Sequence, residues 1–182
     1  MLKQTSLPVI AMAAVALLAA CTPTRTTKSI GETIDDSAIS TKVKAALARD
    51  DKTSAMRTNV ETFRGVVQLN GFASSATEKA EATRVARSVS GVQRVENNLK
   101  IDSSGRSAGE VVDDKVIEAK VKTDLIADPA VAGREVKVAV RDGIVQLGGF
   151  VDNAQQKMQA ERIAAAVGGV KSVDNQLSVK MQ

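Results

Sequence analysis

Histidine is missing from this 182-residue sequence, as are tryptophan and tyrosine, and Cys21 is its single cysteine. These absences exclude histidine-based acid–base catalysis, metal sites built from cysteine or histidine, and an internal disulfide. A catalyst would have to work with carboxylates, lysines, arginines and hydroxyls alone. We therefore expect no enzyme and no cofactor, and we keep a hydrolase only as a formal third class of function.

Aromatic residues and net charge are also scarce. Aromatic side chains make up 2% of the chain and hydrophobic ones 43%, so any core must consist of Val, Ile, Leu and Ala. The formal charge of +4 is small for this length and indicates a surface of mixed sign. Nucleic-acid binding usually needs a concentrated basic field, so we expect no nucleic-acid partner.

The N-terminus has the pattern of a lipoprotein export signal. Residues 1–20 contain Lys3 followed by an apolar run over 7–20, which is shorter than the span of about 20 residues that crosses a bilayer. The run ends in Leu18-Ala19-Ala20-Cys21, which resembles the bacterial lipobox. That resemblance implies cleavage before Cys21 and lipidation of its thiol, and several acyl chains would anchor the protein firmly to a membrane.

The residues that follow Cys21 bear on location and mobility. In enteric-type envelopes an Asp after the lipidated cysteine favours the inner membrane, and here Thr22 stands in that place. The resemblance therefore implies the periplasmic face of the outer membrane. Residues 21–34 are polar and turn-prone, so we predict a lipidated N-terminus followed by a flexible tether.

The rest of the chain contains an internal repeat. Residues 35–101 align without gaps with residues 113–179 at an offset of 78 (113 minus 35), and about two in five aligned positions are identical. We predict that each copy is one domain. Residues 102–112 are rich in Ser and Gly and are predicted to be a linker, which leaves open whether the two domains pack together.

The residue pattern of each copy predicts a helix, two strands, a second helix and a third strand. The first helix is marked by apolar residues at every fourth position: Ile39, Val43 and Leu47, and Ile117, Val121 and Leu125. The pairs Asp35-Asp36 and Asp113-Asp114 precede these runs and are interpreted as helix caps. Arg64-Gly65 and Asp142-Gly143 separate alternating apolar segments, which predicts a β-hairpin in each copy.

The order of elements predicts the topology. Strands two and three are joined through a helix, so we expect them to be parallel, whereas strands one and two should be antiparallel. The fold class is therefore α+β, with two tandem copies of a small α-β-β-α-β domain. Each copy is expected to be a three-stranded mixed sheet covered by two helices.

Both copies resemble the BON (bacterial OsmY and nodulation) domain family. The resemblance rests on the opening of residues 35–47, on Gly-Val-Val-Gln-Leu-Asn-Gly-Phe at 65–72 and on Gly-Ile-Val-Gln-Leu-Gly-Gly-Phe at 143–150. It implies a protein of envelope stress or envelope integrity that binds phospholipid or other envelope components. It implies no catalysis.

Most of the repeated residues have structural explanations. The repeated glycines lack the spacing of a phosphate-binding loop and are interpreted as turn residues. Phe72 and Phe150 end a strand and are expected to close the small core of their own copy. Asn97 and Asn175 share the parity of core residues, which indicates a buried amide satisfied by a nearby turn.

The candidate lipid-binding residues are Lys42, Lys44, Lys120 and Lys122 on the first helix of each copy. Anionic lipid attracts such cations, although an ordinary solvated helix face is the alternative. The first copy has a net charge of +3 (11 basic minus 8 acidic residues) and the second −1 (9 minus 10), so the first suits an anionic bilayer better. We expect a protein that binds anionic phospholipid and supports the outer membrane; the alternative is a chaperone-like scaffold for envelope proteins.

Overall fold

The computed structural model describes residues 30–105 and 107–181, so the predicted signal peptide and Cys21 lie outside the described residues. The first copy comprises α1 (Ile30–Arg49), β1 (Thr58–Phe63), β2 (Val66–Ala73), α2 (Ala76–Arg87), β3 (Arg94–Asn97) and β4 (Lys100–Ile101). The second comprises α3 (Ala108–Ala127), β5 (Lys137–Arg141), β6 (Ile144–Gly148), β7 (Phe150–Val151), α4 (Ala154–Ala166), β8 (Ser172–Asn175) and β9 (Ser178–Val179).

The strands pair as the sequence predicts. β1 runs antiparallel to β2 and β2 parallel to β3, and β5, β6 and β8 repeat this arrangement. The last strand of each copy is interrupted, because an asparagine turns the backbone there. Asn97 donates from Nδ2 to the carbonyl of Lys79 at 2.7 Å and accepts from the Leu99 N–H at 3.1 Å. Asn175 makes the equivalent bond to the carbonyl of Lys157 at 2.9 Å. Both amides thus have a packing role, but they are half-buried and bond to a helix carbonyl, whereas a buried amide satisfied by a turn was predicted.

The helices cover one face of each sheet and form an aliphatic core with it. Val43 and Leu47 of α1 and Val121 and Leu125 of α3 are fully buried, which confirms the predicted helical face. The same cores contain the strand residues Val67, Leu69, Val145 and Leu147 and the second-helix residues Ala82, Ala86, Ala160 and Ala164. Aliphatic side chains thus supply the cores, as the composition requires.

The predicted caps at the aspartate pairs are wrong. α1 begins at Ile30 and α3 at Ala108, so part of the predicted tether (21–34) and of the predicted linker (102–112) is helical. Ser107 caps α3 by accepting from the Glu110 N–H at 3.2 Å, and the Glu110 carboxylate accepts from the Ser107 N–H at 2.7 Å. The apolar four-residue spacing begins at Ile39 and Ile117, so it did not mark the turns that precede them in either helix.

The buried aspartates bind the hairpin turns instead. Asp36 accepts from the backbone N–H groups of Arg64 and Gly65 at 2.7 and 2.9 Å. Asp114 accepts from Asp142 and Gly143, both at 2.9 Å. Arg64 and Asp142 have φ of 49° and 53°, which turns two successive N–H groups toward the helix. Each aspartate therefore joins the first helix of its copy to the predicted hairpin.

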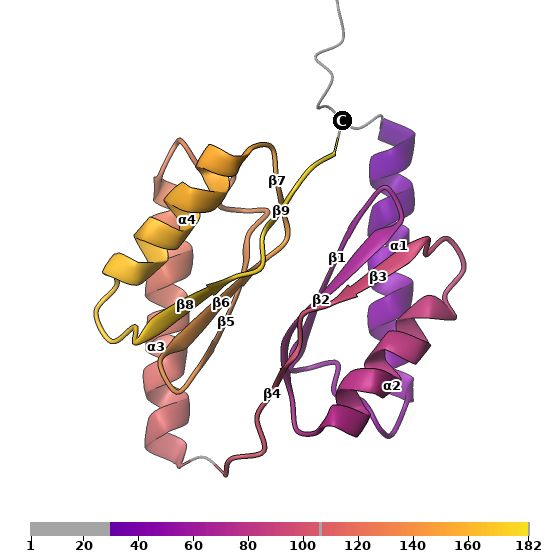
Figure 1. Cartoon of the computed structure of the whole chain (residues 1–182), viewed down its shortest axis with the longest axis horizontal. Helices are drawn as coiled ribbons and strands as arrows, with labels where there is room; N and C mark the ends of the chain where they lie inside the picture. Colours follow the sequence, from indigo (N-terminus) through magenta and orange to yellow (C-terminus); the bar gives the residue numbers. More distant parts are fainter. Residues whose placement is uncertain (1–29, 106, 182) are drawn as a thin grey trace, which may run out of the picture.

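The two copies pack sheet against sheet, with the helices on the two outer sides (Figure 1). This answers the question that the linker composition left open. Along β2, Val67 and Leu69 face the helices, while the alternate residues Gln68 and Asn70 are also buried. The second face of each sheet is therefore covered by the other copy.

Two glutamines at equivalent positions bond across this junction. The Gln68 Oε1 accepts from the Gly149 N–H at 3.0 Å, and the Gln146 Oε1 accepts from the Gly71 N–H. The Gln146 Nε2 donates to the carbonyl of Asn98 at 2.8 Å, and Gln68 donates to the Ser178 hydroxyl at 2.6 Å. The near-symmetric bonds satisfy polar groups that would be costly to bury unpaired.

The phenylalanines extend the junction. The rings of Phe63 and Phe150 lie 5.4 Å apart and come from different copies. The predicted role of Phe150 as a lid on its own core is therefore corrected, because its ring packs across the junction. Phe72 is 8% exposed and, like Phe150, lies outside the two aliphatic clusters.

Candidate functional site

The four candidate lysines are exposed but do not form one surface. Lys42 and Lys44 lie on α1, and Lys120 and Lys122 lie on α3. The two helices occupy opposite outer sides of the molecule and begin at opposite ends of it (Figure 1). A flat membrane can therefore meet one lysine pair at a time.

The lysines also differ in their acidic neighbours. Lys122 Nζ lies 2.6 Å from the Glu118 carboxylate, which also pairs with Lys115 at 2.8 Å. Burial raises the pKa of Glu118, but its hydrogen bonds from Lys115 and Lys122 outweigh burial and hold that pKa below its ordinary value. Glu118 stays ionised and partly cancels the charge of Lys122.

A cleft recurs in each copy between the first helix, the hairpin turn and the turn after the second helix. Its volume is 670 Å³ in the first copy and 390 Å³ in the second. Both values fall within the range of about 300–1,000 Å³ that is usual for ligand pockets. Asp36 and Asp114 shape the two clefts by holding the hairpin turn against the helix.

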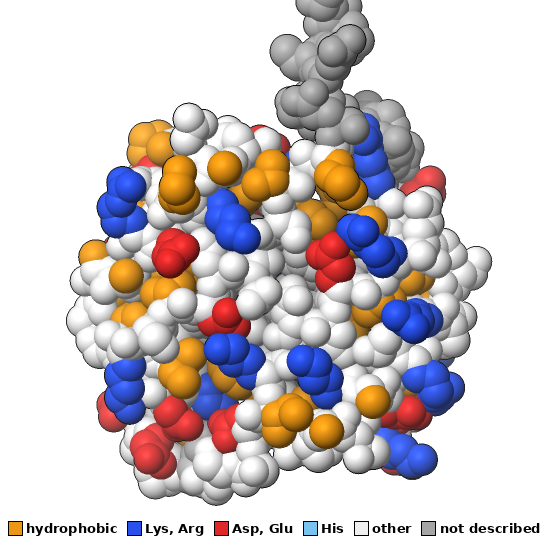
Figure 2. All heavy atoms as spheres, in the orientation of Figure 1, with side chains coloured by type: hydrophobic (Ala, Val, Ile, Leu, Met, Phe, Trp, Pro, Cys, Tyr) orange, Lys and Arg blue, Asp and Glu red, His pale blue; other side chains and the backbone are white. Residues whose placement is uncertain are grey.

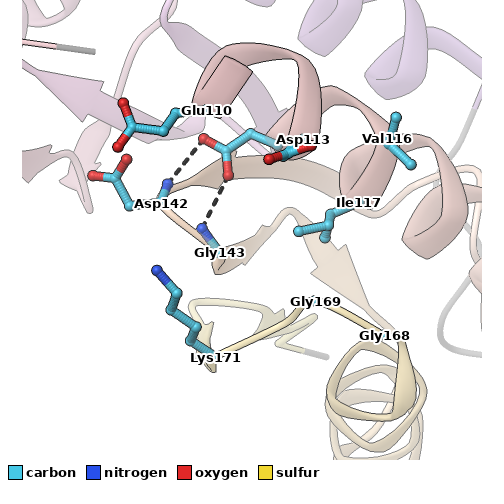
Figure 3. Close-up of a pocket in the computed structure, with 10 residues that line it drawn as sticks. Glu110, Asp113, Val116, Ile117, Asp142, Gly143, Gly168, Gly169 and Lys171 are labelled. Atoms are coloured by element: carbon cyan, nitrogen blue, oxygen red, sulfur yellow. Dashed lines mark hydrogen bonds between the residues drawn. The ribbon is translucent and has the colours of Figure 1, made fainter. Parts of the chain in front are cut away.

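The two clefts differ in charge. Two basic side chains, Lys42 and Arg64, and two acidic ones, Asp35 and Asp36, line the first. In the second, Glu110, Asp113 and Asp142 lie together and Lys171 is the basic residue among those that line it (Figure 3). The sequence analysis identified Lys42 as a candidate but missed Arg64. The repeat alignment places Arg64 opposite Asp142, so this turn position is basic in the first copy and acidic in the second.

The first half of α3 exposes aliphatic side chains. Val112 is 60% exposed and Val116 47%. The repeat places Ala38 of α1, a smaller side chain, opposite Val116. Elsewhere basic and acidic side chains are interspersed, as Figure 2 shows for one face.

Residues 30–105 and 107–181 contain neither a metal-ligating cluster nor a membrane-spanning helix. No cluster of three or more Asp, Glu or Cys side chains there is arranged to hold a metal ion. No helix in that part of the chain is long and apolar enough to cross a membrane.

Comparisons with known proteins agree with the repeat. A family model described as the BON domain matches residues 35–103 and 113–181. Osmotically-inducible protein Y of Escherichia coli (strain K12) is 43% identical over 152 residues, which cover 83% of this chain and 76% of that protein. Outer membrane lipoprotein DolP of Haemophilus influenzae is 35% identical over 147 residues, which cover 80% of this chain and 75% of that protein.

A solved structure was also found, of the C-terminal domain of CdsD, a structural protein of the Type III secretion system of Chlamydia trachomatis. Its TM-score is 0.34 at 12% identity, and the match covers 78% of this chain and 96% of that one. A similarity of this size carries no structural argument.

Proposed function

This chain belongs to the BON domain family, and from that membership we propose a non-catalytic envelope lipoprotein that binds anionic phospholipid and supports outer-membrane integrity under osmotic or envelope stress. The relatives support an envelope role, since one is named for osmotic induction and another as an outer membrane lipoprotein. The proposed location is the periplasmic face of the outer membrane, with a lipid anchor on Cys21.

The anchor has a direct test. Mass spectrometry of the mature protein should find an N-terminus at Cys21 that carries the mass of its acyl groups, because Leu18-Ala19-Ala20-Cys21 has the form of a lipobox. A mature protein whose Cys21 carries no acyl group would contradict this part of the proposal.

The observation that best supports lipid binding is the cleft of the first copy, which is the less acidic of the two. Lys42 and Arg64 line it, and it lies on α1, the helix that follows the proposed tether. A lipid anchor raises the local concentration of headgroups, so a weak second contact suffices. The first copy is also the one with the net charge of +3 (11 minus 8).

Co-sedimentation with vesicles tests the proposal on residues 22–182, which contain both cores. Wild type should bind vesicles that contain anionic lipid, bind neutral vesicles weakly, and lose affinity as salt rises. Single changes to Glu should weaken binding most at Lys42. Lys44 and Lys120 should follow, and Lys122 should matter least because Glu118 already pairs with it.

The alternative remains a chaperone-like scaffold that binds envelope proteins. The exposed Val112 and Val116 beside the acidic cleft of the second copy favour it, since such a surface suits a peptide with apolar and basic residues. Binding that does not depend on anionic lipid, or four lysine variants with unaltered affinity, would favour this alternative.

A further inference from the structure

A groove of 530 Å³ lies at one end of the junction between the two copies. Phe63 and Phe150, two of the three phenylalanines in the chain, line it together with Val179 and Met181. Val179 is 41% exposed and Met181 67%. The groove thus offers aliphatic and aromatic surface to a ligand that both copies contact.

The rim of this groove is basic. Arg64, Arg94 and Lys157 line it, and Glu96 is the acidic residue among them, held by Arg94 at 2.7 Å. Figure 2 shows hydrophobic side chains gathered near this end of the junction, with basic ones beside them. An apolar floor with a cationic rim matches a molecule that has a hydrocarbon chain and a negatively charged head.

The opposite end of the junction is built differently, although the repeat would permit a second groove. Arg141 occupies the position equivalent to Phe63, and its guanidinium pairs with Asp102. Arg141 also donates to the carbonyl of Ser104 at 2.9 Å. The segment between the copies is therefore held against that end. At the groove, by contrast, Val179 and Met181 of the second copy line the surface.

The groove lies at the end of the molecule where the proposed tether attaches. Arg64 on its rim bonds through its backbone to Asp36, six residues (36 minus 30) after α1 begins and about 9 Å along the helix. From Cys21 to Ile30 is nine residues (30 minus 21), which span at most about 30 Å. A bilayer that holds Cys21 is therefore within reach of the groove.

We propose that this groove binds one anionic phospholipid of the anchoring membrane, with an acyl chain against Phe63, Phe150 and Val179 and the headgroup phosphate at Arg94 and Lys157. The lipid on Cys21 is not the proposed occupant, because its diacylglycerol carries no charge to match the basic rim. The inference rests on the proposed function and assigns the lipid a site separate from the lysines of α1 and α3.

The absence of tryptophan and tyrosine makes a site-specific test possible. Val179→Trp places one fluorophore in the groove, and Ile101→Trp places one at the equivalent, 55% exposed position at the other end of the junction. Vesicles of phosphatidylglycerol with brominated acyl chains should quench the Val179→Trp emission and leave Ile101→Trp nearly unchanged. Brominated phosphatidylcholine should quench neither.

A pair of lysine variants provides a test in which no tryptophan occupies the groove. Lys157→Gln should weaken binding to phosphatidylglycerol vesicles about fivefold, the effect of one basic side chain near an anionic surface. Lys79→Gln is the matched control, since Lys79 holds the equivalent position in α2 and does not line the groove. It should bind like wild type.

The outcomes separate this inference from the proposed function. Wild type that fails to bind phosphatidylglycerol vesicles would overturn both. The wild type could instead bind these vesicles while tryptophans at positions 101 and 179 are quenched equally, or while the two lysine variants bind with equal affinity. Either result would refute lipid binding in the groove and leave the proposed function standing.

Discussion

Glu61 and Asp174 are two carboxyl groups near the junction with opposite pKa shifts. Burial raises the pKa of Glu61, and this effect exceeds the opposing attraction of Lys137, whose Nζ lies 3.4 Å away. Burial also acts to raise the pKa of Asp174. There, hydrogen bonds from Gln176 and Gln146 and the ion pair with Lys100 outweigh burial, so the pKa is lowered.

These shifts predict opposite effects of neutral substitutions. A carboxyl group whose pKa is higher in the folded state than in the unfolded state stabilises the fold at pH values below its unfolded-state pKa. That contribution is lost as the pH rises through its folded-state pKa. Glu61→Gln should therefore raise the denaturation midpoint at pH 7, and by less near pH 4, since the ordinary value is 4.5. Urea titrations at the two pH values measure this difference.

Asp174→Asn is the companion variant of opposite sign. In the wild type, the lowered pKa of Asp174 means that its carboxylate stabilises the fold at pH values above the ordinary pKa of 3.8. This contribution is lost as the pH falls through the folded-state pKa. The variant should be less stable than wild type at pH 7. If both variants shift stability in the same direction, the electrostatic explanation is wrong.

The contact between the first helix and the hairpin is the defining feature at the scale of elements. One buried carboxylate in each copy accepts two backbone hydrogen bonds from a turn that holds a residue at positive φ. The neighbouring Asp35 and Asp113 are exposed. The two members of each aspartate pair therefore have different roles although their residue type is the same.

Asp36→Asn and Asp114→Asn should each destabilise their copy by about 2–3 kcal/mol, because an amide oxygen replaces a charged acceptor and its NH₂ group faces backbone donors. Asp35→Asn and Asp113→Asn are matched controls and should change stability by less than about 0.5 kcal/mol. Denaturant unfolding monitored by circular dichroism measures both. Equal effects within a pair would refute the assigned contacts.

The whole molecule is two copies of one domain whose contact departs from symmetry at more than one position. Asn70 of β2 and its repeat equivalent Gly148 of β6 meet at the junction. A Cβ atom on Gly148 would lie 2.3 Å from Cγ of Asn70, which is itself buried. An asparagine in one copy therefore requires a glycine in the other.

Gly148→Ala should separate the two copies while both cores stay folded, because the added methyl group meets Asn70 and lies on the sheet face away from the helices. Small-angle scattering should report a larger radius of gyration with an unchanged circular dichroism spectrum. Gly168→Ala is the control, since a Cβ atom there meets nothing within 4 Å. A compact Gly148→Ala protein would contradict the proposed packing.

Local patterns predict the interior of each copy well. The four-residue spacing of Ile39, Val43 and Leu47 predicts the buried helix face because it depends on helix geometry alone. The Asp142-Gly143 turn is predicted for the same kind of reason, since positive φ is local. The starts of α1 and α3 were missed because the four-residue apolar spacing begins only at Ile39 and Ile117.

The candidate site was predictable only in part. Lys42 was identified from its place on the first helix, whereas Arg64 lies in a hairpin turn 22 residues later (64 minus 42) and reaches the same cleft through the bonds to Asp36. Phe63 and Phe150 come from different copies, and no spacing within one copy predicts their contact.

The sequence by itself determined the repeat, the order of elements in each copy and the aliphatic face that each helix buries, because each depends on residues close together in the chain. Only the tertiary structure decided what covers the second face of each sheet. The alternation along β2 shows that Gln68 and Asn70 oppose the core face, but a polar residue there fits both water and a polar partner. The bonds of Gln68 and Gln146 form only when the copies meet, so sheet packing decided where the groove lies.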